Sequence, residues 1–207
     1  MTVLDTVVAI SATVCASIMS IFFGYGGIKR RTLFVKLCKR KGVWWRQWAG
    51  ICIFFILLTI YAQWLFGWSR SFINMLLLAS YLFAITITDL RSREIPDDTT
   101  AFYAVLFLLW NLASRDSSFI LNGLLGAVIG AAIPFAIYFI RRDAIGLGDI
   151  KLLGCIGLLT GCPSILFVLL RAMVFGALFS VGLLFLKKGT LKTELPFAPF
   201  VLLAALI

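Results

Sequence analysis

Residues 119–140 read FILNGLLGAVIGAAIPFAIYFI, a run without a charged side chain. A helix needs about 20 mostly apolar residues to cross the hydrocarbon core of a bilayer, so this run predicts a transmembrane helix. The whole chain has the same character: 62% of its 207 residues are hydrophobic, 14% are charged, and its mean hydropathy is +1.05. Soluble domains contain about 25% charged residues. The composition therefore excludes a soluble globular protein and predicts an integral membrane protein.

Eight apolar runs follow one another along the chain, and we expect each to form a helix. They are continuous rather than alternating, which argues against membrane-spanning strands. The predicted fold class is all-α, a polytopic membrane bundle of about eight transmembrane helices in one membrane-embedded domain, residues 1–207. The last run is too short to cross at about 1.5 Å per residue, so that helix is short or truncated. The runs are 3–27, 49–67, 72–88, 100–113, 119–140, 150–162, 164–186 and 196–207.

The basic residues predict how these helices are oriented. Of the 19 lysines and arginines, all except Arg70, Arg115 and Arg171 fall in or near alternate loops. Such residues concentrate in cytoplasmic loops, so we expect the N-terminus outside. A net charge of +10 then reflects basic loops beside anionic lipid, and no nucleic-acid partner is required. The expected cytoplasmic loops are 28–48, which is short, basic and interpreted as an interfacial helix, 89–99, 141–149 and 187–195.

Two absences limit the possible chemistry. The chain contains no histidine, which excludes histidine-dependent zinc proteases and Ser-His or Cys-His catalysis. Its five cysteines form no Cys-x-x-Cys pair, so we expect neither a structural zinc site nor a disulfide framework. No metal and no cofactor are predicted. Acid-base chemistry would have to come from Asp, Glu, Lys, Tyr or Ser.

Two aspartates lie at the ends of apolar runs on the predicted cytoplasmic side. Asp89 closes the run SYLFAITITD, and Asp149 directly precedes the run 150–162, within GLGDIKLLG. Two carboxylates that face each other cannot both ionise easily, so one keeps its proton and the pair can act as acid and base. Our hypothesis is that the ionised partner activates a water while the protonated one polarises a carbonyl. That is hydrolysis of a peptide bond without histidine, metal or serine.

The residues around both aspartates favour a built site over two isolated interfacial charges. Gly146 and Gly148 allow backbone conformations closed to other residues and let another segment come close. Asp149 is expected at a helix N-terminus, where the dipole favours the ionised carboxylate. Lys151 adds to that effect or extends to the interface. Pro96 is placed near the first turn of the next helix.

Three stretches in these regions are similar to the motifs of one family. Residues 89–97 read DLRSREIPD, residues 146–153 read GLGDIKLL, and residues 195–200 read LPFAPF. The first two resemble the two aspartate motifs of the type IV prepilin peptidases, and the third is similar to the Pro-Phe-Gly-Pro-Phe stretch that begins their last helix. The motifs stand in the same order and at helix ends on one predicted side, which makes the resemblance specific.

The resemblance implies a membrane aspartyl endopeptidase with Asp89 and Asp149 as its catalytic pair. It would remove the short basic leader of type IV prepilins, or of the pseudopilins of type II secretion. The cut would follow a glycine at the cytoplasmic face of the bacterial inner membrane. The acidic residues Glu94, Asp97 and Asp98 would shape the field of Asp89 or meet the basic leader. The motif residues that would support the site are Gly146, Gly148, Lys151, Pro96 and Asp97.

The sequence also departs from that family. Members similar to this chain carry a cytoplasmic domain with two Cys-x-x-Cys pairs, which is linked to zinc and to N-methylation of the new N-terminus. The loop 28–48 has one cysteine, Cys38. The resemblance therefore implies a peptidase without N-methyltransferase activity and without use of S-adenosylmethionine.

Two other interpretations stay open. One is a small transporter or channel whose carboxylates bind cations or relay protons, although such charges usually lie near the midplane of the bilayer. The other is an inactive homologue that binds pilins without cutting them. The short last helix keeps this alternative open.

Overall fold

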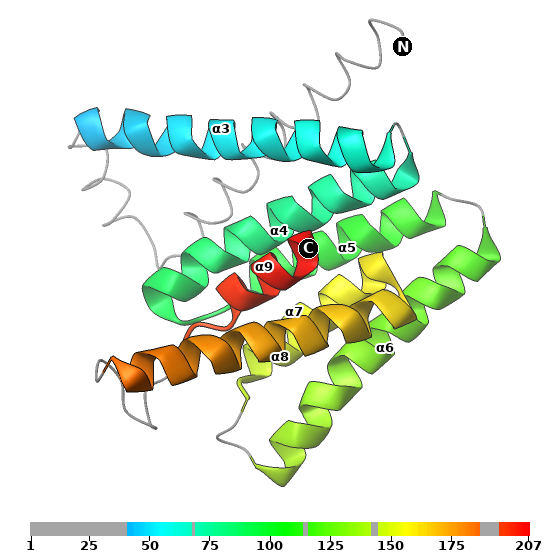
Figure 1. Ribbon diagram of the computed structural model, residues 1–207. Coiled ribbons are helices and arrows are strands. Elements are labelled where there is room, and N and C mark those ends of the chain that lie inside the picture. The colour runs from blue at the N-terminus through cyan, green and yellow to red at the C-terminus, as the bar shows by residue number, and fades with distance from the viewer. Residues whose placement is uncertain (1–40, 68, 114–115, 142–144, 187–194) are drawn as a thin grey trace, which may run out of the picture. The chain divides into compact units, whose positions relative to one another are not determined.

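The computed structural model describes residues 41–67, 69–113, 116–141, 145–186 and 195–207 (Figure 1). Within these ranges every regular element is a helix, as the sequence predicts. The helices are α3 (Lys41–Phe66), α4 (Arg70–Ser92), α5 (Asp97–Leu112), α6 (Ser117–Ile140), α7 (Leu147–Thr160), α8 (Cys162–Phe185) and α9 (Ala198–Leu206). Each predicted run from 49–67 onward corresponds to one of them. The run 3–27 and the first part of the loop 28–48 lie outside the described residues.

The lengths of the helices follow the lengths of the runs. The runs 100–113 and 150–162 predict short helices, and α5 and α7 have 16 and 14 residues. The helix α3 begins earlier than its run. Residues 41–48, interpreted as part of an interfacial helix, are helical as expected and continue into the apolar part without a break. No proline lies between Lys41 and Phe66 to interrupt the helix there.

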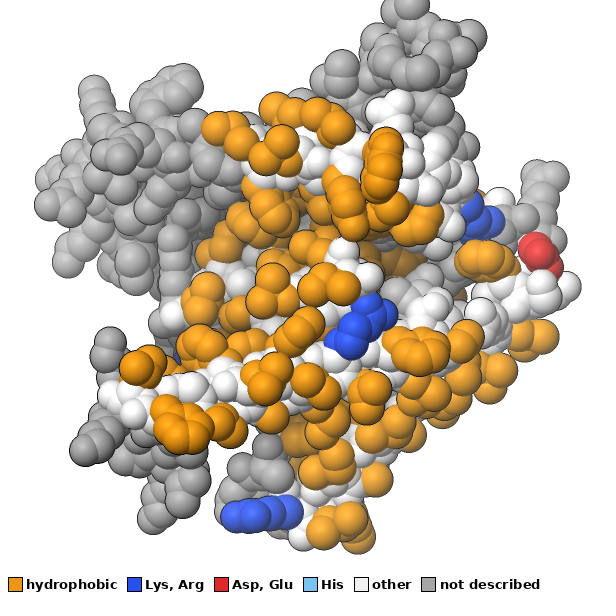
Figure 2. Space-filling model, in the orientation of Figure 1, with side chains coloured by type: hydrophobic (Ala, Val, Ile, Leu, Met, Phe, Trp, Pro, Cys, Tyr) orange, Lys and Arg blue, Asp and Glu red, His pale blue; other side chains and the backbone are white. Residues whose placement is uncertain are grey.

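Three of the described helices are long and apolar enough to cross a bilayer. The qualifying segments are Arg70–Leu90, Ser117–Ile140 and Cys162–Leu183. On α6 and α8 the outward side chains are almost all hydrophobic (Figure 2), among them Leu125, Val128 and Phe167, each more than half exposed. A large exposed apolar surface of this kind suits contact with lipid. The count of about eight spans and the outside N-terminus stay predictions.

The chain divides into two compact units, residues 1–87 and 88–207. In the first unit, the ring of Phe54 on α3 stacks on Phe83 of α4 with centroids 5.3 Å apart, and Phe55 meets Phe83 edge-on at 5.5 Å. Such aromatic pairs contribute about 0.5–1.5 kcal/mol each beyond their buried area. The second unit holds the end of α4 and the helices α5 to α9. The expectation of one membrane-embedded domain stays a prediction.

The helix α7 is the centre of the second unit. It packs against α5, α6 and α8 (Figure 1). Its residues Leu152, Leu153 and Ile156 are at most 1% exposed. A helix that is covered on several sides is apolar around most of its circumference rather than amphipathic. This burial fixes the position of its first turn, which carries Asp149.

Glycines bring the backbones of α6 and α7 into direct contact. A Cβ atom on Gly126 would overlap the carbonyl oxygen of Gly157, and a Cβ atom on Gly157 would overlap the carbonyl oxygen of Gly126. One turn further along α6, a Cβ on Gly130 would lie 2.6 Å from the carbonyl oxygen of Leu153. Small residues at four-residue spacing are how membrane helices approach this closely. The register of α7 along α6 therefore depends on the absence of side chains at these positions.

We predict that Gly157→Ala destabilises the protein by about 1–3 kcal/mol, because the added methyl group forces α6 and α7 apart. The measurement is the thermal unfolding midpoint of the purified protein in detergent. The matched control is Gly182→Ala on α8, where a Cβ atom meets nothing within 4 Å. That change is expected to be neutral or mildly stabilising, as alanine is a better helix former. Equal midpoints for both variants would contradict the prediction.

Candidate functional site

Asp89 lies in the last turn of α4 and is buried, with 6% of its surface exposed. Its Oδ2 atom accepts a hydrogen bond of 2.9 Å from the backbone N–H of Ala198, the first residue of α9. The positive charge of Arg93, one turn further along the chain, also acts on this carboxylate. A buried carboxylate is costly unless it is hydrogen-bonded. The α9 backbone supplies that bond.

Asp149 lies in the first turn of α7. This turn begins where Gly146 adopts an extended N-cap conformation, and the backbone N–H of Asp149 donates to the Gly146 carbonyl at 3.1 Å. Burial raises the pKa of the Asp149 carboxyl to about 6, and the negative charge of Asp89 acts in the same direction. The expected effect of the helix dipole, which favours the ionised form, is therefore outweighed. The two aspartates are therefore close enough for the charge of one to act on the other.

Gly148 lets the first turn of α7 approach the segment that follows Asp89. A Cβ atom at Gly148 would lie 3.1 Å from the Cβ of Ile95, which is a tight contact. A Cβ at Gly146 would lie 3.5 Å from the Asp149 carboxylate, which is ordinary van der Waals distance. Neither glycine has a positive φ. Glycine is thus needed at position 148 because α7 passes close to Ile95 there, and not because the backbone adopts a special conformation.

An ion pair joins the starts of α5 and α7. The Lys151 Nζ atom donates to the Asp97 carboxylate at 2.7 Å, and Asp97 is the first residue of α5. Pro96, in extended conformation, is the N-cap of that helix, one position earlier than its first turn. Both charged side chains are more than half exposed. Such a pair contributes only about 0–1 kcal/mol, so its main effect is to align two helix starts.

The structure thus brings all seven predicted residues into one region of the second unit: the last turn of α4 and the starts of α5 and α7. Two contributors were not predicted, the backbone N–H of Ala198 and the charge of Arg93. A backbone donor has no side-chain chemistry to recognise. Its signal is the motif LPFAPF at residues 195–200, where the proline at position 199 marks a helix start. Helix starts have N–H groups without partners inside the helix.

The described residues do not suit the zinc centre that the family resemblance raises. Among them, no group of three or more His, Cys, Asp or Glu side chains lies close enough together to hold a metal ion. Cys155 and Cys162 are not joined in a disulfide. A structural zinc site needs four such ligands.

Residues 76–181 match the sequence model of the type IV leader peptidase family. The match covers about half of the chain and includes Asp89 and Asp149. The chain belongs to the type IV leader peptidase family. The resemblance that the three motifs suggested is thereby confirmed.

Curated relatives carry the name prepilin leader peptidase/N-methyltransferase. The protein of Stutzerimonas stutzeri is 32% identical over 72% of this chain and 53% of its own length. The Aeromonas salmonicida protein is 30% identical over 68% and 49%, and the Pseudomonas aeruginosa protein is 29% identical over 73% and 53%. The chain spans about half the length of these relatives. No solved structure matches it.

For this leader peptidase family member, we predict that Asp149→Asn raises the thermal midpoint by a few degrees at pH 7.5. The folded protein holds a proton on Asp149 up to a pKa of about 6, against the usual value of 3.8. Ionising it in the folded state therefore costs free energy that grows as the pH rises from about 4 to 6 and is complete above that. Asparagine avoids this cost, so the gain should shrink as the pH falls toward 4.

Thermal unfolding in detergent across this pH range measures the effect. Asp116→Asn is the control and should leave the pH dependence between pH 4 and pH 7.5 unchanged, because asparagine preserves the helix cap that Asp116 provides. A gain for Asp149→Asn that is the same at pH 7.5 and pH 4 would contradict the assignment.

Proposed function

We propose that this protein is a membrane aspartyl endopeptidase that removes the leader from type IV prepilins or pseudopilins, with Asp89 and Asp149 as its catalytic residues. One observation carries the proposal. Burial and the charge of Asp89 raise the pKa of the Asp149 carboxyl to about 6, so up to about that pH Asp149 keeps its proton and the site holds an acid and a base together. At higher pH, activity depends on the fraction of molecules that keep this proton. Membership of the leader peptidase family supplies the substrate class.

The chemistry follows from that pairing. The Asp89 carboxylate, fixed by the Ala198 N–H, takes a proton from a water, and the water oxygen attacks the scissile carbonyl carbon. The protonated Asp149 donates to the carbonyl oxygen, which becomes the hydroxyl of the tetrahedral intermediate. The C–N bond then breaks, the proton held by Asp89 passes to the leaving amine, and Asp149 recovers its own proton. One water is consumed for each bond cut.

The depth of the two aspartates supports cleavage at a membrane face. Asp89 lies one residue before the end of the apolar segment Arg70–Leu90, and Asp149 lies at the start of α7. A leader that ends just outside a hydrophobic helix would present its scissile bond at that level. With the basic loops facing inward, the site would lie on the cytoplasmic side of the bacterial inner membrane, beside anionic lipid. The substrate would be cut after a glycine.

The same placement argues against the two alternatives. A transporter or channel would hold its carboxylates near the midplane, whereas these lie at helix ends. An inactive pilin-binding homologue would not need two carboxyls whose charges interact. The arrangement favours the peptidase.

We further propose that this protein does not methylate the new N-terminus. The loop 28–48 holds a single cysteine, Cys38, where two Cys-x-x-Cys pairs would be needed.

We predict that the wild type cuts a co-expressed pilin-like substrate after the glycine that ends its basic leader, while Asp89→Asn and Asp149→Asn cut at least 100-fold more slowly. The loss follows from removing the acid or the base, each of which contributes about 10²–10⁴-fold. Mass spectrometry of the membrane fraction gives the extent and position of the cut. Asp116→Asn is the matched control, because asparagine preserves the helix cap that Asp116 provides. If either active-site variant cuts as fast as the wild type, the proposed dyad is wrong.

The same spectra test the second proposal. The new N-terminus is expected as a free amine. A product heavier by one methyl group, formed only when this protein is present, would overturn it.

A further inference from the structure

The backbone of α9 reaches the candidate base from a distant part of the chain. The N–H of Ala198 and the carboxylate of Asp89 are 109 positions apart, and the bond between them is buried and 2.9 Å long. The backbone of Phe197 interacts with the same carboxylate. Resting on the proposed function, we infer that the start of α9 is a positioning element of the active site: the Ala198 N–H fixes the orientation of the Asp89 carboxylate for catalysis.

The donor is specific because of how α9 begins. The first N–H groups of a helix have no partner within it. Here Phe200 and Val201 donate to the Phe197 carbonyl at 3.1 and 3.2 Å, and the proline at position 199 has no N–H to offer. Ala198 is thus left as the residue of this turn whose N–H is free to reach a side chain.

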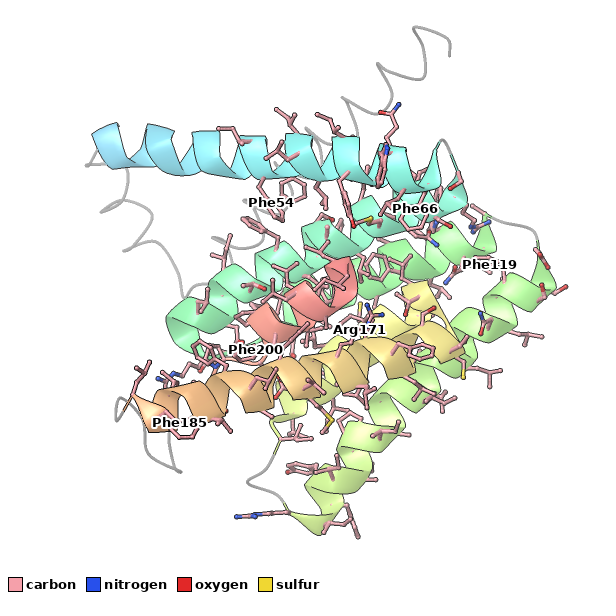
Figure 3. All side chains as sticks on the ribbon, viewed as in Figure 1. Phe54, Phe66, Phe119, Arg171, Phe185 and Phe200 are labelled. Atoms are coloured by element: carbon pink, nitrogen blue, oxygen red, sulfur yellow. The ribbon has the colours of Figure 1, made fainter. Side chains whose placement is uncertain are left out.

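The start of α9 is also held firmly in place. The ring of Phe200 packs on Phe179 of α8 with centroids 5.4 Å apart. Figure 3 shows Phe200 near the start of α9, beside α8. Ala198, Val201 and Ala204 are fully buried. A donor on a packed helix keeps its position better than one on a loop, which is what a positioning role requires.

A larger residue at position 198 would push this backbone away. The methyl group of Ala198 is completely covered, so added volume must be accommodated by a shift of α9. Glycine adds no volume and keeps the N–H. The type of side chain therefore matters only through its size, while the backbone atom does the positioning.

The decisive test replaces the single backbone N–H by oxygen. The full chain is made by cell-free translation into liposomes, with nonsense suppression inserting lactic acid, the hydroxy analogue of alanine, at position 198. The same analogue at Ala204 is the matched control, since it also removes one backbone N–H of a fully buried alanine in α9. The substrate is a synthetic peptide with a basic leader, a cleavage-site glycine and a hydrophobic helix.

We expect the ester at position 198 to lower kcat about 10- to 100-fold, the usual worth of a hydrogen bond to a charged group, with KM unchanged. The ester at position 204 should stay within about threefold of the wild type. Each ester removes one buried hydrogen bond, so the thermal midpoint is expected to fall by a similar amount for both. Among side-chain variants, Ala198→Gly should retain activity and Ala198→Val should lose it.

The outcomes separate the two proposals. If the wild type cuts, Asp89→Asn does not, and the ester at position 198 cuts at the wild-type rate, the positioning role is overturned and the proposed function stands. An ester whose only change is a higher KM, or one matched by the ester at position 204, also overturns it. If Asp89→Asn cuts normally, the proposed function itself fails.

Discussion

Two carboxyl groups removed from water set the main constraint on this structure. In an apolar chain of this kind a buried carboxylate needs a hydrogen bond or a counter charge, and two together also repel each other. Asp89 is provided with the N–H of Ala198 and the nearby charge of Arg93. Burial and the charge of Asp89 raise the pKa of Asp149 to about 6. The two carboxyls have different partners, and two interacting carboxyls that do not both ionise can supply an acid and a base at one site.

The rest of the second unit holds these groups in place. The backbone contact between Gly126 and Gly157 sets the position of α7, and the first turn of α7 carries Asp149. The contact of Gly148 with Ile95 and the ion pair between Lys151 and Asp97 then bring that turn to the start of α5. Functional groups are placed accurately when they stand on packed helices, and here each aspartate stands on the terminal turn of one.

Most of the helices and both aspartates could be predicted from the sequence. The features that could not be predicted share one cause. Continuous apolar runs located α4 to α9 to within a few residues, and three short motifs indicated the family and both aspartates. The features that the sequence did not predict depend on contacts between segments that are far apart in the chain. Periodicity cannot show that Lys151 pairs with Asp97, that Gly148 is small because Ile95 lies beside it, or that burial of Asp149 outweighs the helix dipole. Helix at residues 41–48 agrees with the interfacial helix expected in the loop 28–48, but its continuation into the apolar run as one helix, α3, was not predicted.

The match to the family's sequence model ends before the last part of the candidate site. The family match ends at residue 181, yet the donor to Asp89 comes from Ala198 on α9. A backbone N–H is present in every residue except proline, so this function makes no demand on side-chain chemistry and only a demand on size. The motif at residues 195–200 indicates that a helix starts there, but not that its N–H reaches Asp89. The proline at the second position of α9 and the small residue at its first are the physical requirements behind that contact.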